Sequence, residues 1–141
     1  MKRRSGFTLV EIMVVVVIIG LLAGIVGPQI MARLEEAKRT TARTQISNFE
    51  KSLEMYRMHN SVYPTTQQGL EALVRRPTIA PIPKRYSQEG YAKEIPLDPW
   101  GNPYIYRSPG ERHPYDIIST ARTGEEGGEG FDADVTNHDP S

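Results

Sequence analysis

The sequence predicts an α+β fold, in which one long N-terminal helix packs against a small head containing a short helix and a small antiparallel β-sheet. Three observations lead to this prediction. Residues 12–32 form an apolar run of 21 residues without a charge, and residues 33–60 carry apolar side chains at spacings of three and four, so both segments are typical of helix. Two β-rich runs, residues 104–108 and 115–120, are joined by a loop containing proline and glycine, which is typical of a hairpin.

The first segment, residues 7–32, is expected to span a membrane. At about 1.5 Å per helical residue, its charge-free part reaches roughly 30 Å, the thickness of the hydrocarbon core of a bilayer. Lys2, Arg3 and Arg4 precede it. The positive-inside rule therefore predicts a cytoplasmic N-terminus and a head on the other side of the membrane.

Glycines and a proline mark the second half of this span. Gly20, Gly24 and Gly27 are spaced by four and three residues, so they share a helix face and would allow a neighbouring helix to approach closely. The alternative is that glycine is simply more common in membrane helices. Pro28 lacks a backbone donor and disfavours helical geometry at the preceding residue, so we expect a kink or local melting there.

Residues 33–60 are expected to continue the span as an amphipathic helix whose apolar stripe is buried. The stripe consists of Ile30, Leu34, Ala37, Thr41, Ala42, Ile46, Phe49, Leu53 and Tyr56. Together the two segments predict one helix of some 50 residues, far longer than the helices of ordinary globular domains.

The head is expected to occupy residues 61–141. Thr65 with Gln68 fits a capping box, so a short helix should begin there and direct Leu70, Leu73 and Val74 inward. The turn-rich segment 96–104 is expected to hold Trp100 in a small core, with an aromatic-ligand site as the alternative. After Thr120 the chain becomes rich in glycine and acidic residues, with a brief strand expected near Val135.

Composition excludes several classes of protein. The 17 basic and 17 acidic residues cancel, which argues against a nucleic-acid partner because no excess positive charge is available for phosphates. The chain has no cysteine, so disulfides cannot stabilise the head. His59, His113 and His138 do not have the spacing of a ligand set, and no nucleophile motif is present, so the sequence predicts a protein that is not an enzyme.

The N-terminal residues resemble a known signal. The stretch KRRSGFTLVE, residues 2–11, resembles the class III leader of type IV pilins and of the pseudopilins of type II secretion. The resemblance implies that residues 1–6 are a leader, that a prepilin peptidase cuts between Gly6 and Phe7, and that the new amino group of Phe7 is methylated. It also implies that the helix around Pro28 can unwind in an assembled filament.

Four stretches of the head narrow the resemblance to the major pseudopilins of the type II secretion system. They are, in order, YPTTQQGLEAL, DPWGNPY, SPGERHPYDIIS and GEEGGEGFDADV. The resemblance implies a pilin-like fold and a structural subunit that polymerises from the inner membrane into a periplasmic filament and promotes export of folded proteins through an outer-membrane secretin. The implied partners are further copies of the chain, minor pseudopilins, the prepilin peptidase, an inner-membrane assembly platform and membrane lipid.

Glu11 is the candidate assembly residue. An ionised side chain deep in a bilayer costs about 2.5 to 3.5 kcal/mol on insertion scales, so a lone acid there usually has a partner. The resemblance implies that Glu11 pairs with the Phe7 amine of an adjacent subunit and sets its register. The alternative is an acid that is tolerated because it lies near the membrane surface.

The acidic loop after Thr120 is a candidate calcium site. Calcium takes six to eight oxygen ligands, although the loop lacks the glycine and terminal glutamate of an EF-hand. The resemblance implies four ligands: the carbonyls of Thr120 and Glu125 and the side chains of Asp132 and Asp134. Position 123, usually Asp in the family, is Thr here, and the family's tryptophan soon after the last Asp is absent. A solvated acidic loop is therefore a serious alternative.

Two other functions stay open. A type IV pilus subunit would share the leader and the long helix but would serve adhesion, motility or DNA uptake. A membrane-tethered calcium-binding module that acts as a monomer is the second alternative.

Overall fold

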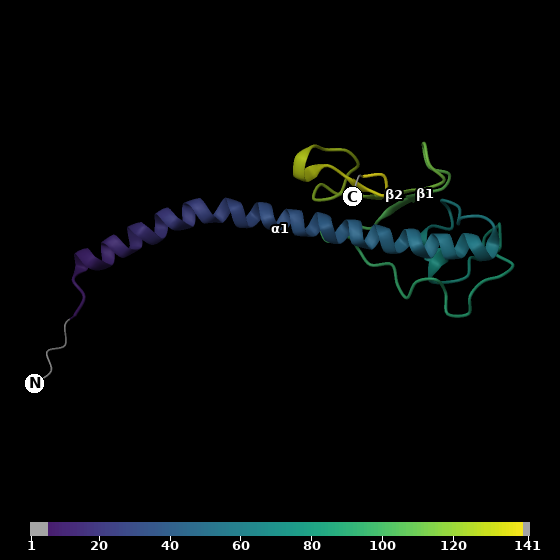
Figure 1. The fold of residues 1–141 in the computed structure, drawn as a ribbon, viewed down its shortest axis with the longest axis horizontal. Coiled ribbons are helices and arrows are strands. Elements are labelled where there is room, and N and C mark those ends of the chain that lie inside the picture. The colour runs from purple at the N-terminus through teal and green to yellow at the C-terminus, as the bar shows by residue number, and fades with distance from the viewer. Residues whose placement is uncertain (1–5, 140–141) are drawn as a thin grey trace, which may run out of the picture. The chain divides into compact units, whose positions relative to one another are not determined.

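The computed structural model describes residues 6–139 (Figure 1). Helix α1 (Leu9–Asn60) is followed by the 3₁₀ helix η1 (Leu70–Leu73), strands β1 (Ile105–Arg107) and β2 (Asp116–Ser119), the 3₁₀ helix η2 (Gly130–Asp132) and strand β3 (Val135–Thr136). This order confirms the predicted α+β class and the single long helix. Contacts along the backbone divide the chain into two units, residues 1–36 and residues 37–141.

In the first unit, the side chains of residues 6–31 are all exposed. The helix continues without interruption through Pro28, so the local melting expected there is absent from this structure. A proline removes one backbone hydrogen bond, while the bonds of the turns on either side can hold the helix together. A kink at this residue and unwinding in a filament stay predictions.

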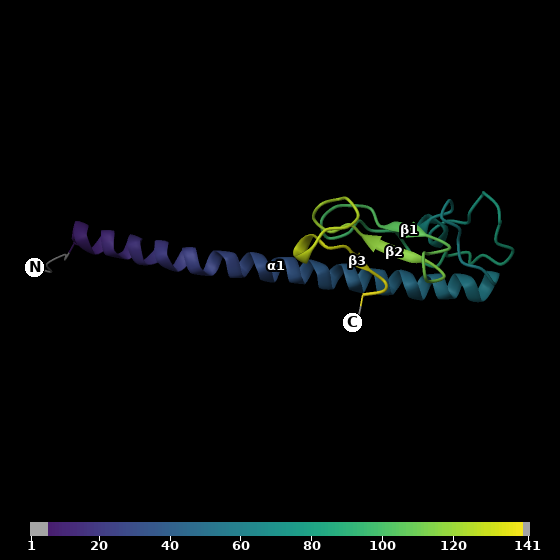
Figure 2. The same ribbon diagram turned by 90° about the horizontal axis from the view of Figure 1, so that it is seen from above.

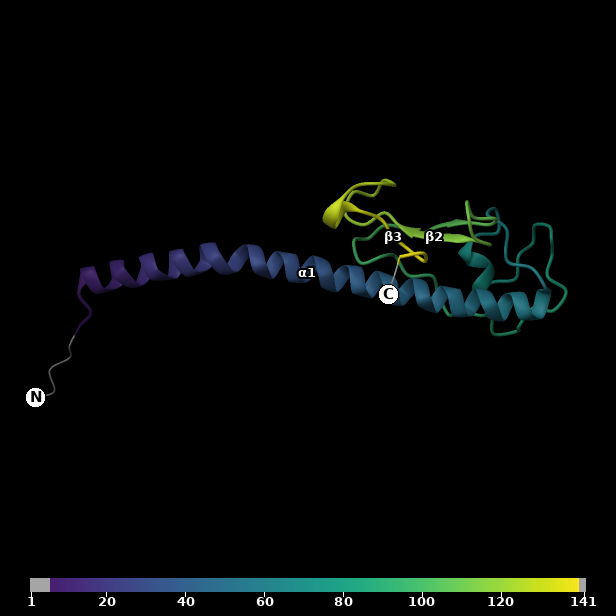
Figure 3. The same cartoon turned by 45° about the horizontal axis from the view of Figure 1, so that its top comes forward.

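The second unit is built around the C-terminal part of α1, along which the small sheet lies (Figures 2 and 3). Successive turns of the helix bury Ala42, Ile46, Phe49, Leu53 and Tyr56. These side chains pack with buried residues of the head, including Leu73 of η1 and Ile117 of β2. The helix therefore supplies one wall of the head's core, as the sequence predicts.

The first four members of the helix stripe are not covered by the described part of the same chain, so their burial against something else stays a prediction. Ile30 and Leu34 in the first unit, and Ala37 and Thr41 in the second, are exposed. The structure buries the helix stripe only from Ala42 onward. Within residues 6–139, nothing covers the large apolar side chains of the helix before that point.

The three strands form one antiparallel sheet with the order β1-β2-β3. Ile105 pairs with Ile118, and on the other side of β2 Ser119 pairs with Val135. All four residues of the central strand β2 are buried. The predicted hairpin and the brief strand near Val135 are both confirmed.

The short helix of the head differs from its prediction. The capping box is present, because the Thr65 amide donates to Gln68 Oε1 at 3.0 Å and the Gln68 amide donates to Thr65 Oγ1 at 3.2 Å. A single turn follows and ends at Gly69, whose φ of 63° is outside the helical region, so the chain enters the 3₁₀ helix η1 instead of an α-helix. Leu70 and Leu73 face the core as expected.

A buried carboxylate organises the turn that precedes β1. Asp98 Oδ1 accepts hydrogen bonds from the amides of Trp100 and Asn102 at 3.1 and 2.7 Å, and Asp98 Oδ2 accepts one from the Ser119 hydroxyl at 2.6 Å. Asp98 and Ser119 are buried, and Trp100 packs partly buried against the core. The turn therefore holds Trp100 as predicted, with Asp98 as its anchor to β2.

Candidate assembly and cation-binding sites

Glu11 lies in the first turn of α1, where it forms a capping box with Thr8. The Thr8 amide donates to Glu11 Oε2 at 2.8 Å, and the Glu11 amide donates to Thr8 Oγ1 at 3.2 Å. Two amides that the helix cannot satisfy internally are thereby bonded, and the carboxylate also interacts favourably with the positive end of the helix dipole. Within one chain, Glu11 is a helix-capping residue.

The sequence itself predicts this helix cap, in addition to the assembly role expected for Glu11. Thr8 and Glu11 have the threonine-to-glutamate spacing of three that defines a capping box. Capping uses Glu11 Oε2, and the side chain is exposed. Both roles, helix cap and partner for an adjacent amine, are therefore chemically compatible.

The predicted cleavage position borders the described part of the chain. Gly6 and Phe7 are exposed and precede the first helical residue. Residues 1–5 of the predicted leader lie outside the described residues. The methylation of Phe7 leaves no trace in an unprocessed chain and stays a prediction.

The three glycines of the apolar segment have open space around them. A Cβ atom built at Gly20, Gly24 or Gly27 meets nothing within 4 Å. No contact with the described part of the chain therefore requires glycine at these positions. Their use as a packing face against a neighbouring helix stays a prediction.

Among the described residues, α1 is the one helix long and apolar enough to cross a membrane, and no part of its most apolar stretch is buried. Before Gly27, this helix exposes fourteen large side chains of valine, leucine, isoleucine or methionine. So large an apolar surface is stable only against lipid or other protein.

The hydroxyl of Thr123, where the resemblance implies an aspartate, bridges the backbone of the candidate calcium loop. Thr123 Oγ1 lies 3.1 Å from the Thr120 carbonyl and 2.9 Å from the Glu125 carbonyl, and it accepts a hydrogen bond from the Glu125 amide. The structure therefore brings together the two carbonyls expected as ligands. A hydroxyl oxygen can bind a cation, although it carries no charge.

The two aspartates of the loop differ in their contacts. Arg122 Nε donates to Asp132 Oδ1 at 2.8 Å, and this hydrogen bond lowers the pKa of the Asp132 carboxyl. Asp134 Oδ2 accepts the Gly127 amide at 2.9 Å, whereas Asp134 Oδ1 is buried without a hydrogen-bond partner. An unpartnered buried carboxylate oxygen is costly and is expected where a cation binds.

The carbonyl and carboxylate oxygens of the loop are the ligand type that calcium prefers, and the unpartnered oxygen of Asp134 is consistent with a bound cation. The negative charge of the loop's ligand set is low, because Thr123 carries no charge and Arg122 neutralises Asp132. Within residues 6–139, no group of three histidine, aspartate or glutamate side chains is arranged to hold a metal through side chains alone. Any binding therefore depends on the backbone carbonyls as well.

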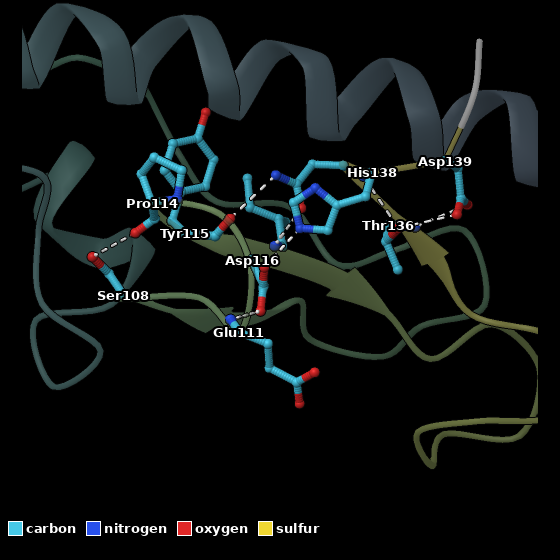
Figure 4. A network of polar contacts seen from close by, with 10 residues as sticks. Ser108, Glu111, Pro114, Tyr115, Asp116, Thr136, His138 and Asp139 are labelled. Atoms are coloured by element: carbon cyan, nitrogen blue, oxygen red, sulfur yellow. Dashed lines mark hydrogen bonds and ion pairs between the residues drawn. The ribbon is translucent and has the colours of Figure 1, made fainter.

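Two histidines that the sequence gives no reason to connect, His113 and His138, contact each other. Figure 4 shows His138 beside Asp116 of β2. The rings of His113 and His138 stack with centroids 3.8 Å apart, and His138 Nε2 lies 2.6 Å from Asp116 Oδ1. Burial raises the pKa of the Asp116 carboxyl, but hydrogen bonds from the Glu111 amide and His138 outweigh it, so the pKa is lowered from its usual value.

This cluster fastens the C-terminal segment to the hairpin. Asn137 adds to it, because its side-chain oxygen accepts the Ile117 amide at 2.9 Å. No spacing rule links positions 113 and 138, so the sequence offers no signal for their contact. His59 lies apart from them and contacts the Tyr91 hydroxyl.

Comparison with known proteins agrees with this arrangement. Residues 29–138 match the family described as "Type II secretion system (T2SS), protein G", and residues 1–27 match the "Prokaryotic N-terminal methylation motif". The type II secretion system core protein G of Pseudomonas aeruginosa is 52% identical over 138 residues, which cover 98% of this chain and 97% of that protein. The protein of the same name from Vibrio cholerae is 50% identical, with coverage of 97% and 93%.

A solved structure has the same fold. The crystal structure of the major pseudopilin from the type 2 secretion system of enterohaemorrhagic Escherichia coli matches with a TM-score of 0.69 and 40% identity. The match covers 76% of this chain and 91% of that chain. Two sequence matches that together cover nearly the whole chain and a shared fold lead to one assignment: the chain belongs to the protein G family of the type II secretion system, the pseudopilin subunits.

Proposed function

We propose that this chain is inserted in the inner membrane with its N-terminus in the cytoplasm and polymerises into a periplasmic filament that promotes export of folded proteins through an outer-membrane secretin. The observation that carries the proposal is the exposed apolar surface of Phe7 and of α1 from Leu9 to Leu34. A surface of this size requires lipid before assembly and neighbouring helices after it. The work of the protein is mechanical, and the proposal includes no catalytic step.

The proposal includes processing and assembly steps. A prepilin peptidase removes residues 1–6 and methylates Phe7, and the amine of Phe7 then pairs with Glu11 of the adjacent subunit. Gly20, Gly24 and Gly27 allow close approach of the helices in the filament core, and Pro28 allows the helix to lengthen there. An inner-membrane assembly platform adds subunits, and minor pseudopilins complete the filament.

A type IV pilus subunit is the second candidate, since the methylation motif fits it equally well. The match of residues 29–138 to the secretion family favours the first. A strain lacking this chain separates them. If the chain is a secretion subunit, its loss traps folded exported proteins in the periplasm. If it is a pilus subunit, its loss leaves export intact and removes long surface fibres.

We also propose that the head binds calcium weakly. The carbonyls of Thr120 and Glu125 and the carboxylates of Asp132 and Asp134 would hold the ion. Bound calcium would supply positive charge that neutralises the two carboxylates and joins both ends of the loop. The unpartnered Oδ1 of Asp134 supports this proposal, and the contact between Arg122 and Asp132 weakens the expected affinity.

Chelation is expected to lower the melting temperature of a soluble fragment containing residues 33–141. At a calcium concentration ten times the dissociation constant, binding stabilises the head by about 1.4 kcal/mol, which corresponds to roughly 5 °C. Melting curves recorded with calcium and with excess EDTA measure this difference. Asp134→Asn should abolish it and Thr123→Asp should enlarge it. A melting temperature that EDTA leaves unchanged in the native head contradicts the proposal.

A further inference from the structure

A basic hollow lies at the end of the head where α1 terminates. It has a volume of about 580 Å³ and is lined by residues 56, 58–62 and 81–85, which include Lys84 and Arg85 but no acidic residue. Its apolar lining is open to solvent, because Met58, Val62 and Ile82 are 76, 49 and 54% exposed. The side chains of Lys84 and Arg85 are exposed and form no ion pair among the described residues. The hollow therefore combines unused positive charge with uncovered apolar surface.

The acidic loop, residues 122–134, has the complementary properties. Glu125 and Glu129 are exposed, and within residues 6–139 their carboxylates form no ion pair. Between them and the end of η2 lies Phe131, whose large ring is 44% exposed. An aromatic side chain in so polar a loop has no core to join within its own head. Exposed aromatic residues flanked by charge are typical anchors of protein interfaces.

The loop and the hollow lie at opposite ends of the same unit. Arg39 Nη1 donates to the Ala133 carbonyl at 2.6 Å, which places the loop beside the start of the unit's helix. The Arg85 amide donates to Asn60 Oδ1 at 3.2 Å, which places the hollow at the last residue of α1. The helix between positions 39 and 60 is roughly 30 Å long. Figure 1 shows the loop in yellow and the hollow's segments in teal at these two ends. One head cannot bring them together.

We propose that the acidic loop of one copy of this chain docks into the basic hollow of the next copy, with Phe131 against Met58, Val62 and Ile82. The inference rests on the proposed function and names the surfaces through which heads contact each other in the filament. A contact between two different surfaces of identical subunits can be repeated from each subunit to the next. When the rotation between neighbours does not close the subunits into a ring, the repeated contact builds a helical filament. Glu125 and Glu129 then face Lys84 and Arg85, which fixes the head-to-tail direction.

Engineered cysteines test the contact in the full-length chain, assembled into filaments in cells. The native chain has no cysteine, so every disulfide is reported by the introduced pair. Ile82→Cys combined with Phe131→Cys should give a ladder of dimers, trimers and longer oligomers after mild oxidation. The two positions are too far apart within one head for an intramolecular bond, which requires Cα atoms within about 7 Å. The matched control is Leu97→Cys combined with Phe131→Cys, because Leu97 is equally exposed but lies outside the hollow.

A charge exchange tests the polarity of the contact. Reversing the charge of the loop with Glu125→Lys and Glu129→Lys should reduce filament yield about tenfold. The two new positive charges would then face the two positive charges of the hollow. Adding Lys84→Glu and Arg85→Glu to the same chain should restore the yield. Recovery in the fourfold variant supports docking, since a merely destabilised head would be weakened further by two more substitutions.

The outcomes separate this inference from the proposed function. Filaments of the native chain together with no ladder from the Ile82 and Phe131 pair overturn the docking and leave the filament function standing. A disulfide from Ile82→Cys to a different envelope protein, in place of the ladder, also overturns it. Failure of the native chain to form filaments overturns the proposed function, and the inference falls with it.

Discussion

Replacing Glu11 with Gln is expected to abolish filament assembly as completely as replacing it with Ala. Glutamine preserves the capping box with Thr8, because its side-chain oxygen accepts the same amide hydrogen bond. It removes only the negative charge that the proposed pairing with the Phe7 amine of the adjacent subunit requires. Loss of one partner of a buried ion pair costs about 2 to 5 kcal/mol, or roughly 30-fold to several thousandfold in association. The measurement is the amount of subunit in filaments sheared from cells, relative to the total.

Two controls distinguish loss of the Glu11 charge from failed processing and from loss of the helix cap. The mass of the mature N-terminus should show methylated Phe7 in both Glu11 variants, which establishes that they are processed. Thr8→Ala removes the hydroxyl half of the cap, at a cost of about 1 kcal/mol, and should leave filaments largely intact. Normal filaments from Glu11→Gln, together with their loss in Glu11→Ala, would show that Glu11 acts through the helix cap instead of through its charge.

Replacing Asp98 with Ala is expected to destabilise the head more than any surface change. The substitution leaves two backbone amides and the buried Ser119 hydroxyl without their acceptor. We expect a loss of about 3 kcal/mol in the free energy of unfolding and a fall of more than roughly 10 °C in melting temperature. Thermal unfolding of the fragment containing residues 33–141, followed by circular dichroism, measures both.

Matched variants separate the hydrogen bonds of Asp98 from its charge. Asp98→Asn keeps an acceptor oxygen for the turn amides, so its effect should be smaller than that of Ala. Glu111→Ala removes an exposed side chain whose amide, and not its carboxylate, contacts Asp116, and should change stability by less than about 0.5 kcal/mol. An Asp98→Ala head within 1 kcal/mol of the native one would contradict the anchoring role.

The parts of the fold that follow from short-range patterns could be predicted from the sequence. The apolar repeat from Ala42 to Tyr56 identifies the buried helix face, and the alternation of turn formers and β-branched residues identifies β1 and β2. The capping box of Thr65 and Gln68 is equally local, because both partners lie within one turn. The positive φ of Gly69, which ends the turn before η1, could not be predicted, since glycine is equally able to adopt a negative φ.

The contacts between distant residues could not be predicted. Asp98 reaches Ser119 at one end of β2, and His138 reaches Asp116 and His113 at the other end. Both contacts join residues that are far apart in the sequence and depend on the folded sheet. Exposure of Ile30 and Leu34 has a related cause: periodicity shows that a helix face is apolar but not whether the same chain covers it. The exposure of Phe131 and the position of the basic hollow likewise could not be predicted from the sequence, because both depend on the fold of the head.

The central claim, a filament subunit that serves protein export, is tested most directly by locating exported proteins in a strain that lacks this chain. The measurement is the fraction of a folded exported enzyme found in the periplasm and in the growth medium. We predict that the enzyme accumulates in the periplasm and that the native chain, but not its Glu11→Ala variant, returns it to the medium. Export that continues undiminished without the chain, accompanied by loss of long surface fibres, would contradict the claim.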